Sequence, residues 1–175
     1  METLPQATIP SARFHVAVQV GDFDLQAEMR TLSAGDRGIG AITSFLGLVR
    51  DLNLADDVVA LELEHYPGMT EKALIRIAEE AAVRWPLHGV SIIHRVGKLY
   101  PGDAIVLVLV ASAHRHAAFE ANAFIMDFLK TRAPFWKKEW TPEGPRWVDA
   151  RETDYSAAAR WHKVVSEQYG NDEHD

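Results

Sequence analysis

The feature that most constrains the fold is a continuous apolar run, Ala104–Ala111, with the sequence AIVLVLVA. Membrane helices need ~18 to 20 apolar residues, so this run is far too short to be one and has the length of a strand instead. An unbroken apolar strand has no polar face to present to water. The run therefore predicts a central strand that is covered on both faces of its sheet.

Strand-like and helix-like periodicities alternate on either side of this run. Pairs of strands stand between the helices, which favours an α+β fold over a doubly wound parallel sheet, where a helix would separate every two strands. Ser112 is expected to cap the third helix, and Pro134 to end it near Arg132. The expected strands are 13–20, 38–49, 58–66, 89–96, 104–111, 135–140 and 146–148, and the expected helices are 24–32, 67–85, 112–132 and 154–166.

The length of 175 residues fits one domain better than two. We expect a single domain over residues 13–166, with a flexible tail at 1–12 and an acidic flexible tail at 167–175. The first residues contain no basic cluster followed by an apolar stretch, so they are not typical of a secretory signal. The expected location is the cytoplasm, and no membrane association is expected.

The absence of cysteine excludes disulfides and thiolate zinc sites, and the chain cannot carry a persulfide. Any sulfur chemistry must receive its sulfur from another molecule. The net charge of −7 argues against nucleic-acid binding. Basic residues nevertheless gather between Lys130 and Arg151, which favours a small anionic ligand over a polyanion.

Charged side chains stand where predicted elements begin or end, where a rigid scaffold can present them to a ligand. Arginines at such positions can grip phosphate or carboxylate with two hydrogen bonds. A lysine near other cations has a lowered pKa and can act as a nucleophile or base. The residues in these positions are Arg50, His114, Arg115, Lys130, Lys137 and Glu139.

A purely structural reading of the same residues stays open at this point. His114 could only cap a helix, Lys130 is favoured near a helix C-terminus, and Lys137 with Glu139 could be an exposed ion pair. No phosphate-binding loop or nucleophile elbow occurs in the sequence. No metal site or cofactor is predicted, and three histidines on presumed strands are interpreted as structural: His65, His88 and His94.

Five segments resemble the catalytic subunit family of molybdopterin synthase, in order and over nearly the whole chain from about residue 14 to 161. They are long and chemically unusual, which makes the resemblance specific. The segments are GAITSFLGLVRD (40–51), LEHYPGMTEKAL (63–74), HRVGKLYPGD (94–103), SAHRHAAFEANAFIMDFLKTRAPFWKKE (112–139) and TPEGPRWVDAR (141–151).

The resemblance implies an α/β hammerhead-type fold with a mixed or antiparallel sheet and flanking helices. It implies a homodimer that binds two ubiquitin-like sulfur-carrier subunits, giving a heterotetramer. Each carrier ends in a Gly-Gly thiocarboxylate that enters a pocket of the large subunit. Two sulfur transfers then convert cyclic pyranopterin monophosphate into the molybdopterin dithiolene of the molybdenum cofactor, so the expected enzyme is a sulfurtransferase without a cofactor of its own.

The resemblance also implies roles for individual residues. Lys130 and Lys137 match the two lysines on which catalysis depends, and Arg151 is expected to help bind an anion, possibly across the dimer. The full set implied to contact substrate is Leu48, Val49, Arg50, His114, Arg115, Lys130, Lys137, Lys138, Glu139 and Arg151. Two alternatives stay open: a scaffold that docks a ubiquitin-like protein without catalysis, and a phosphate-ester hydrolase or transferase that uses the same basic pocket.

Overall fold

A computed structural model describes residues 11–50, 58–148 and 155–162. The predicted helices and strands all have counterparts there, with ends that differ by a few residues. In chain order the elements are β1 (Arg13–Gln19), α1 (Leu25–Ser33), β2 (Ala41–Leu48), β3 (Ala60–His65), α2 (Met69–Arg84), β4 (Leu87–Arg95), β5 (Gly97–Leu99), β6 (Ala104–Ser112), α3 (Arg115–Arg132), β7 (Phe135–Thr141), β8 (Gly144–Val148) and a helical segment at 155–162.

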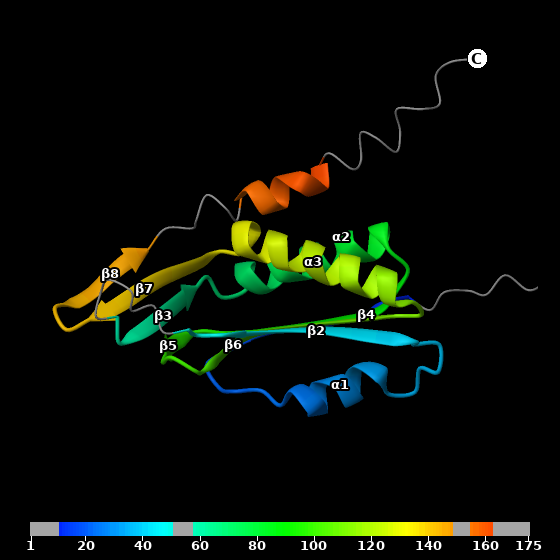
Figure 1. The fold of residues 1–175 in the computed structure, drawn as a ribbon, viewed down its shortest axis with the longest axis horizontal. Coiled ribbons are helices and arrows are strands. Elements are labelled where there is room, and N and C mark those ends of the chain that lie inside the picture. The colour runs from blue at the N-terminus through cyan, green and yellow to red at the C-terminus, as the bar shows by residue number, and fades with distance from the viewer. Residues whose placement is uncertain (1–10, 51–57, 149–154, 163–175) are drawn as a thin grey trace, which may run out of the picture.

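The larger sheet is mixed and has the strand order β1-β4-β6-β2. β1 runs parallel to β4, whereas β6 pairs antiparallel with both β4 and β2. Helices α2 and α3 cover one face of this sheet and α1 covers the other (Figure 1). Residues 107–111 of β6 are fully buried between these layers. The prediction of a central strand covered on both faces is therefore confirmed.

The smaller sheet is antiparallel, has the order β5-β3-β7-β8, and extends from one end of the larger sheet (Figure 1). Its edge strand β5 is not among the predicted strands, because three residues are too few to show an alternation. Gly97 opens β5 with φ +83°, a conformation that favours glycine and turns the chain from the first sheet into the second. The fold is thus α+β with a mixed and an antiparallel sheet, as the fold-class prediction stated.

The start of α3 differs from the prediction. Ser112 was expected to cap this helix, but it is the last residue of β6, and His114 occupies the N-cap position. The Ser112 hydroxyl instead donates to the Pro86 carbonyl at 2.8 Å and accepts the His114 backbone N–H at 3.4 Å. It therefore fixes the β6–α3 turn to the turn before β4. The predicted end near Arg132 is confirmed.

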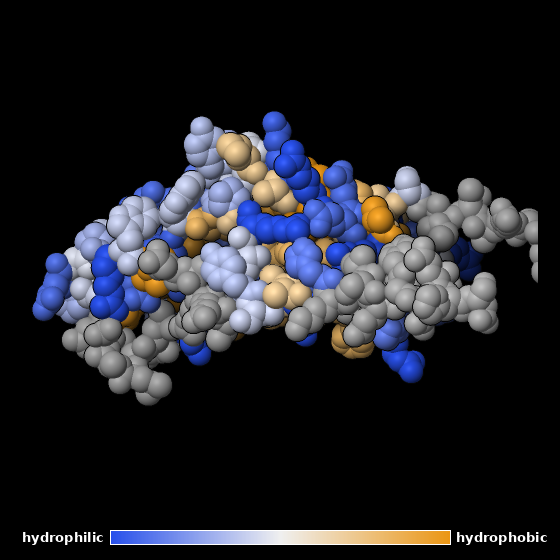
Figure 2. All heavy atoms as spheres, turned by 90° about the horizontal axis from the view of Figure 1, so that it is seen from above, coloured by the Kyte–Doolittle hydropathy of each residue, from blue (hydrophilic) through white to orange (hydrophobic). Residues whose placement is uncertain are grey.

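The helical segment 155–162 packs on the outside of α2 and α3 (Figure 1). Trp161 is 7% exposed, lies edge-on to Trp85 and Phe124, and donates its indole N–H to Asp127 at 2.7 Å. On this side of the molecule, polar side chains alternate with apolar ones over the helical layer (Figure 2). Within the described ranges, no helix is long and apolar enough to cross a membrane. The predicted tails at 1–12 and 167–175 lie mostly outside those ranges.

Candidate active site

Lys130 and Lys137 lie on either side of the turn that joins α3 to β7. Lys130 is exposed two residues before the helix ends, and Lys137 is the third residue of β7. Side chains two apart on a strand share a face, so Phe135, Lys137 and Glu139 point to the same side of the smaller sheet. Their partners on β3 include the buried Leu61 and Leu63. This is therefore the inner face, where the sheet packs on the protein core.

The Glu139 carboxylate is 13% exposed and binds Arg146 of β8, which is its cross-strand partner. The arginine Nε and one terminal nitrogen both reach the same carboxylate oxygen, at 3.1 and 2.9 Å. The purely structural reading of the sequence pairs Glu139 with Lys137. The ion pair found among the described residues joins Glu139 to Arg146, which is not one of the predicted site residues.

Lys138 projects from the opposite face of β7. Its ammonium group donates to Glu64 on β3 at 2.5 Å and lies 4.3 Å from the centre of the Trp147 ring. The hydrogen bond to Glu64 raises the pKa of Lys138. Lys137 and Lys138 are neighbours in sequence but face different sides of the sheet, so one pocket on the inner face receives only the first of them.

A buried histidine lies behind the two catalytic candidates. His94 is 6% exposed, and its ring stacks on Phe135 with centroids 3.9 Å apart and planes 23° apart. Burial, with smaller contributions from the nearby Lys130 and His65, lowers its pKa to about 4. His65 pairs with Phe135 across β3 and β7, and among the described residues its Nδ1 is buried without a hydrogen-bond partner. His94, His65 and Phe135 thus form a ring cluster under Lys130.

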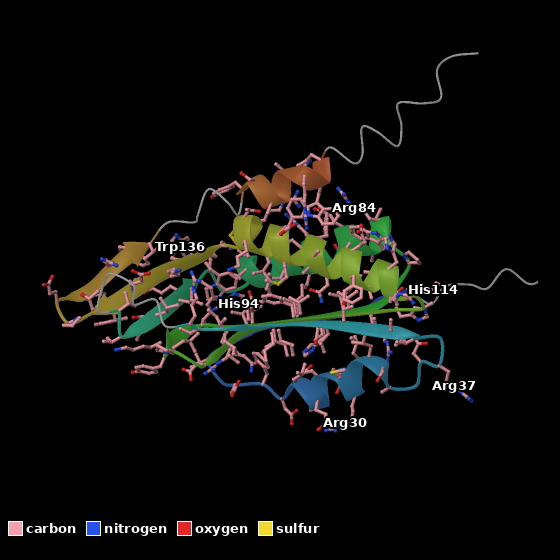
Figure 3. All side chains as sticks on the ribbon, viewed as in Figure 1. Arg30, Arg37, Arg84, His94, His114 and Trp136 are labelled. Atoms are coloured by element: carbon pink, nitrogen blue, oxygen red, sulfur yellow. The ribbon has the colours of Figure 1, made fainter. Side chains whose placement is uncertain are left out.

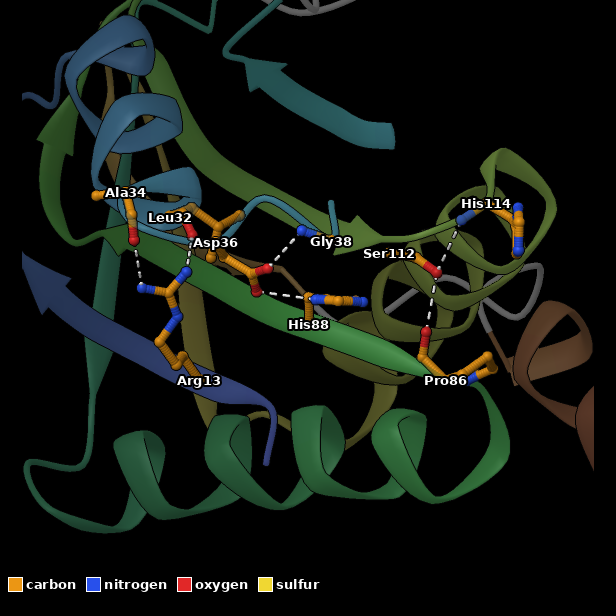
Figure 4. A network of polar contacts seen from close by, with 9 residues as sticks. All are labelled: Arg13, Leu32, Ala34, Asp36, Gly38, Pro86, His88, Ser112 and His114. Atoms are coloured by element: carbon orange, nitrogen blue, oxygen red, sulfur yellow. Dashed lines mark hydrogen bonds and ion pairs between the residues drawn. The ribbon is translucent and has the colours of Figure 1, made fainter. Parts of the chain in front are cut away.

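His88 has a structural role of the kind predicted for the three histidines. The His88 ring lies 2.8 Å from a carboxylate oxygen of Asp36, and this hydrogen bond lowers the Asp36 pKa. As Figure 4 shows, Asp36 also accepts the Gly38 backbone N–H, while Arg13 donates to two carbonyls at the end of α1. His88 therefore anchors the loop after α1 on the larger sheet, away from the lysines.

The segment Leu48–Arg50 lies at the same end of the larger sheet as Lys130. Val49 is buried, donates its N–H to the Asp103 carbonyl at 2.8 Å and accepts the Gly102 N–H at 2.6 Å. These two bonds fix the backbone immediately before Arg50, whose side chain is exposed. Leu48 is also exposed, at 55%. An arginine is thus presented from a rigid strand end.

His114 and Arg115 lie at the other end of the molecule. Fifteen residues of α3, at about 1.5 Å each, separate Arg115 from Lys130 by roughly 22 Å along the helix axis. Figure 3 shows His114 and His94 near opposite ends of the larger sheet. The predicted substrate-contacting residues therefore do not converge within a single chain. Arg151 lies outside the described residues.

A cavity among the described residues lies elsewhere, between β1 and α1. No predicted site residue lines it, and its walls are Arg13, Phe14, His15, Glu28, Thr31, Leu32 and Ser91. In the described part of the chain, no three His, Cys, Asp or Glu side chains lie close enough to hold a metal ion. Lys130 and Lys137 lie where α3 meets the smaller sheet and do not line this cavity.

Sequence reasoning missed three residues at this site: His94, Phe135 and Arg146. The signal for Arg146 was available, since it lies in a predicted strand pair opposite Glu139. Phe135 was included in a predicted strand without a role, and His94 was visible only as one of several scattered histidines. Neither indicates from its sequence position that the other lies against it.

The family model described as "MoaE protein" matches residues 18–132. The molybdopterin synthase catalytic subunit of Vibrio cholerae is 58% identical over 146 residues, covering 83% of this chain and 97% of that protein. The Escherichia coli protein of the same name is 66% identical over 122 residues, covering 70% and 81%.

Solved structures give the same result. The molybdopterin biosynthesis MoaE protein of Burkholderia ambifaria superposes with a TM-score of 0.74 at 56% identity, over 85% of this chain and 97% of that one. Molybdopterin synthase from Staphylococcus aureus superposes with a TM-score of 0.70 at 32% identity, over 75% and 95%. Sequence and fold agree over most of the chain, and the chain therefore belongs to the MoaE family of molybdopterin synthase catalytic subunits.

Proposed function

We propose that this chain transfers two sulfurs from a thiocarboxylated carrier protein to cyclic pyranopterin monophosphate, at the surface formed by Lys130, Lys137 and Arg50. In each transfer, the thiocarboxylate sulfur bonds to a side-chain carbon of the pterin and gives an acyl thioester, while the oxygen on that carbon leaves, either as the phosphate oxygen when the cyclic ester opens or as water. Water then cleaves the bond between the acyl carbon and sulfur, which leaves sulfur on the pterin and a carboxylate on the carrier. The observation that carries the proposal is the pair of lysines flanking the α3–β7 turn.

The two lysines suit the charges of this reaction. Attack of water on the thioester carbon creates an oxyanion, and ammonium groups beside it stabilise that charge. An amine in the same place can also take a proton or briefly hold the acyl group. The sequence contains no cysteine, so a sulfur donor has to come on a second molecule, as the proposal requires.

The proposed sulfur donor is a small ubiquitin-like subunit with a C-terminal Gly-Gly thiocarboxylate. A Helicobacter pylori structure with a TM-score of 0.64 is described as a complex of subunits 1 and 2 of molybdopterin-converting factor. At 18% identity it supports the fold alone, but the complex is an assembly of the kind proposed. We also propose that the reaction takes place in the cytoplasm.

The separation of His114 and Arg115 from the lysines leads us to propose a homodimer with shared sites. β2 is an edge strand of the larger sheet and carries exposed apolar side chains at Phe45, Leu46 and Leu48. In a two-fold dimer through this edge, the two β2 strands run antiparallel. The Arg50 end of one copy then lies beside the His114 end of the other, so each site receives groups from both chains.

The direct test is reconstitution with cyclic pyranopterin monophosphate and a thiocarboxylated carrier, following dithiolene formation. Lys130→Ala and Lys137→Ala are expected to lose activity by about two or more orders of magnitude, the range for removing one group that stabilises an oxyanion. Lys72→Ala, an exposed lysine on α2, is the matched control and should stay active. Carrier binding without product in wild type would favour the scaffold alternative. Phosphate release without sulfur transfer would favour the hydrolase.

Shared sites can be tested by combining inactive chains. Lys130→Ala and Arg115→Ala chains would be co-expressed with different affinity tags, and the hybrid dimers isolated. One of the two sites in each hybrid is then intact, so about half of the wild-type activity is expected. A hybrid of Lys130→Ala with Lys137→Ala is the control and should stay inactive, because both lysines come from the same chain. Two equally inactive hybrids would refute the shared site.

A further inference from the structure

We propose that His94 is a positioning residue for the sulfur-transfer site: its buried imidazole supports Phe135 and so fixes the α3–β7 turn that carries Lys130 and Lys137. This inference rests on the proposed function, because it assigns a role within the same reaction. It concerns a residue that does not itself reach the substrate.

The His94 ring is held on two sides. Its Nδ1 lies 2.8 Å from the carbonyl oxygen of Arg95. A carbonyl can only accept a hydrogen bond, so Nδ1 carries the proton and Nε2 has a free lone pair. One face of the ring lies on Phe135 with centroids 3.9 Å apart. The bond fixes the rotation of the ring, and the stack transmits that orientation to Phe135.

His94 is itself fixed to the most rigid part of the protein. It is the second-last residue of β4, which lies between β1 and β6 in the larger sheet. It pairs with Val106 of the central strand, and its other neighbour in register is Val18. The ring therefore extends from the middle of one sheet towards the first residue of a strand in the other.

Phe135 is well placed to pass this constraint on to both lysines. It begins β7, five residues after Lys130 and two before Lys137, and it shares its strand face with Lys137. Ala133 and Pro134, which precede it, form the whole connection between helix and strand. A shift of the Phe135 ring would therefore move the helix end and the strand start relative to each other.

The charge state of the ring supports this role. Burial keeps His94 neutral at physiological pH, with a pKa of about 4. A neutral ring can lie beneath Lys130 and next to His65 without adding a positive charge to the lysine site. A lysine or arginine in the same place would repel Lys130, and an aliphatic side chain would lose the flat stacking surface.

The experiment compares His94→Asn, which keeps a donor but loses the ring, with His94→Phe, which keeps the ring. His94→Asn is expected to lower kcat about 100-fold, as for a reacting group displaced by ~1 Å, with the KM for the pterin changed by less than about twofold. His94→Phe is expected to keep kcat within about fivefold of wild type, with the same pH profile. His88→Asn, the same substitution on the same strand, is the matched control and should keep its kcat.

A double-mutant cycle with Phe135→Leu tests whether His94 acts through Phe135. If it does, the double variant His94→Asn/Phe135→Leu is no slower than the worse single variant. If the fold-loss of kcat in the double variant equals the product of the two single fold-losses, the inference is wrong. A normal kcat in His94→Asn would also overturn it. An inactive but folded His94→Phe would also overturn it, because the imidazole would then be needed for proton transfer. If wild type itself makes no dithiolene, both the proposed function and this inference are wrong. If wild type is active and His94→Asn is equally active, only the inference is wrong.

Discussion

Acid should destabilise this protein through His94 in a way that can be calculated. An exposed histidine has a pKa near 6.5, and burial lowers that of His94 to about 4 in the folded chain. Between these two values the unfolded chain binds a proton that the folded chain does not. The stability that the neutral ring contributes is therefore fully present above about pH 6.5 and is lost as the pH falls towards 4.

The size of the effect follows from the difference of about 2.5 pKa units between the two states. Each unit corresponds to about 1.4 kcal/mol, so roughly 2 kcal/mol of unfolding free energy should disappear between about pH 7 and about pH 4.5. The titratable groups that face the ring are Lys130 and His65. The contribution of other titrating groups is removed by comparison with a variant that lacks the His94 imidazole.

The assay is urea unfolding of wild type and His94→Asn at several pH values in this range, followed by tryptophan fluorescence at one protein concentration. The variant is expected to be less stable at about pH 7, and the gap should narrow by roughly 2 kcal/mol at about pH 4.5. His116→Asn, at an exposed histidine of α3, serves as the control. Parallel pH curves for wild type and His94→Asn would refute the reasoning, because the folded ring would then titrate like an exposed one.

Three further predictions concern packing and assembly. Gly40→Ala should cost about 1–3 kcal/mol of unfolding free energy, because an added methyl group would overlap the Ala113 backbone carbonyl. The control Gly21→Ala places its methyl group in open space and should cost much less. Equal losses of stability in thermal or urea unfolding would contradict this. Trp161→Ala should cost roughly 3–5 kcal/mol through loss of its buried packing, whereas Trp147→Ala, 59% exposed, should cost far less in the same assay. Leu46→Glu on the edge strand β2 should convert the proposed dimer into monomers, as measured by analytical ultracentrifugation. Val83→Glu on the exposed side of α2 is the control and should leave the dimer intact. A Leu46→Glu variant that stays dimeric would exclude this edge as the interface.

Most of the fold could be predicted from the sequence, because its signals are local. The apolar run at 104–111 identified the central strand by itself, and Pro134 marked the end of α3. The errors occurred where contacts between distant segments decide the structure. Ser112 is a residue type that favours helix caps, but its hydroxyl donates to Pro86, a residue from another turn that no local pattern identifies. The strand β5 is held by pairing with β3 and was too short to predict.

The sequence selects the residues of the proposed site but does not give their arrangement. The family resemblance implied that Lys130, Lys137 and Lys138 contact the substrate together. Side chains alternate between the two faces of β7, however, so Lys138 lies on the other face, where it binds Glu64. The length of α3 separates Arg115 from Lys130 by a distance that a list of sequence motifs does not reveal.

The sequence by itself determined the chemistry available to this protein: lysines and arginines at the ends of elements, and no thiol. Only the tertiary structure decided which of these groups meet. His94 and Phe135 are 41 residues apart and come into contact because the two sheets join at this point. The low pKa of His94 has the same origin, since it depends on burial by segments distant in the chain. Periodicity and residue type act over a few neighbours, whereas contact and burial depend on how the whole chain packs.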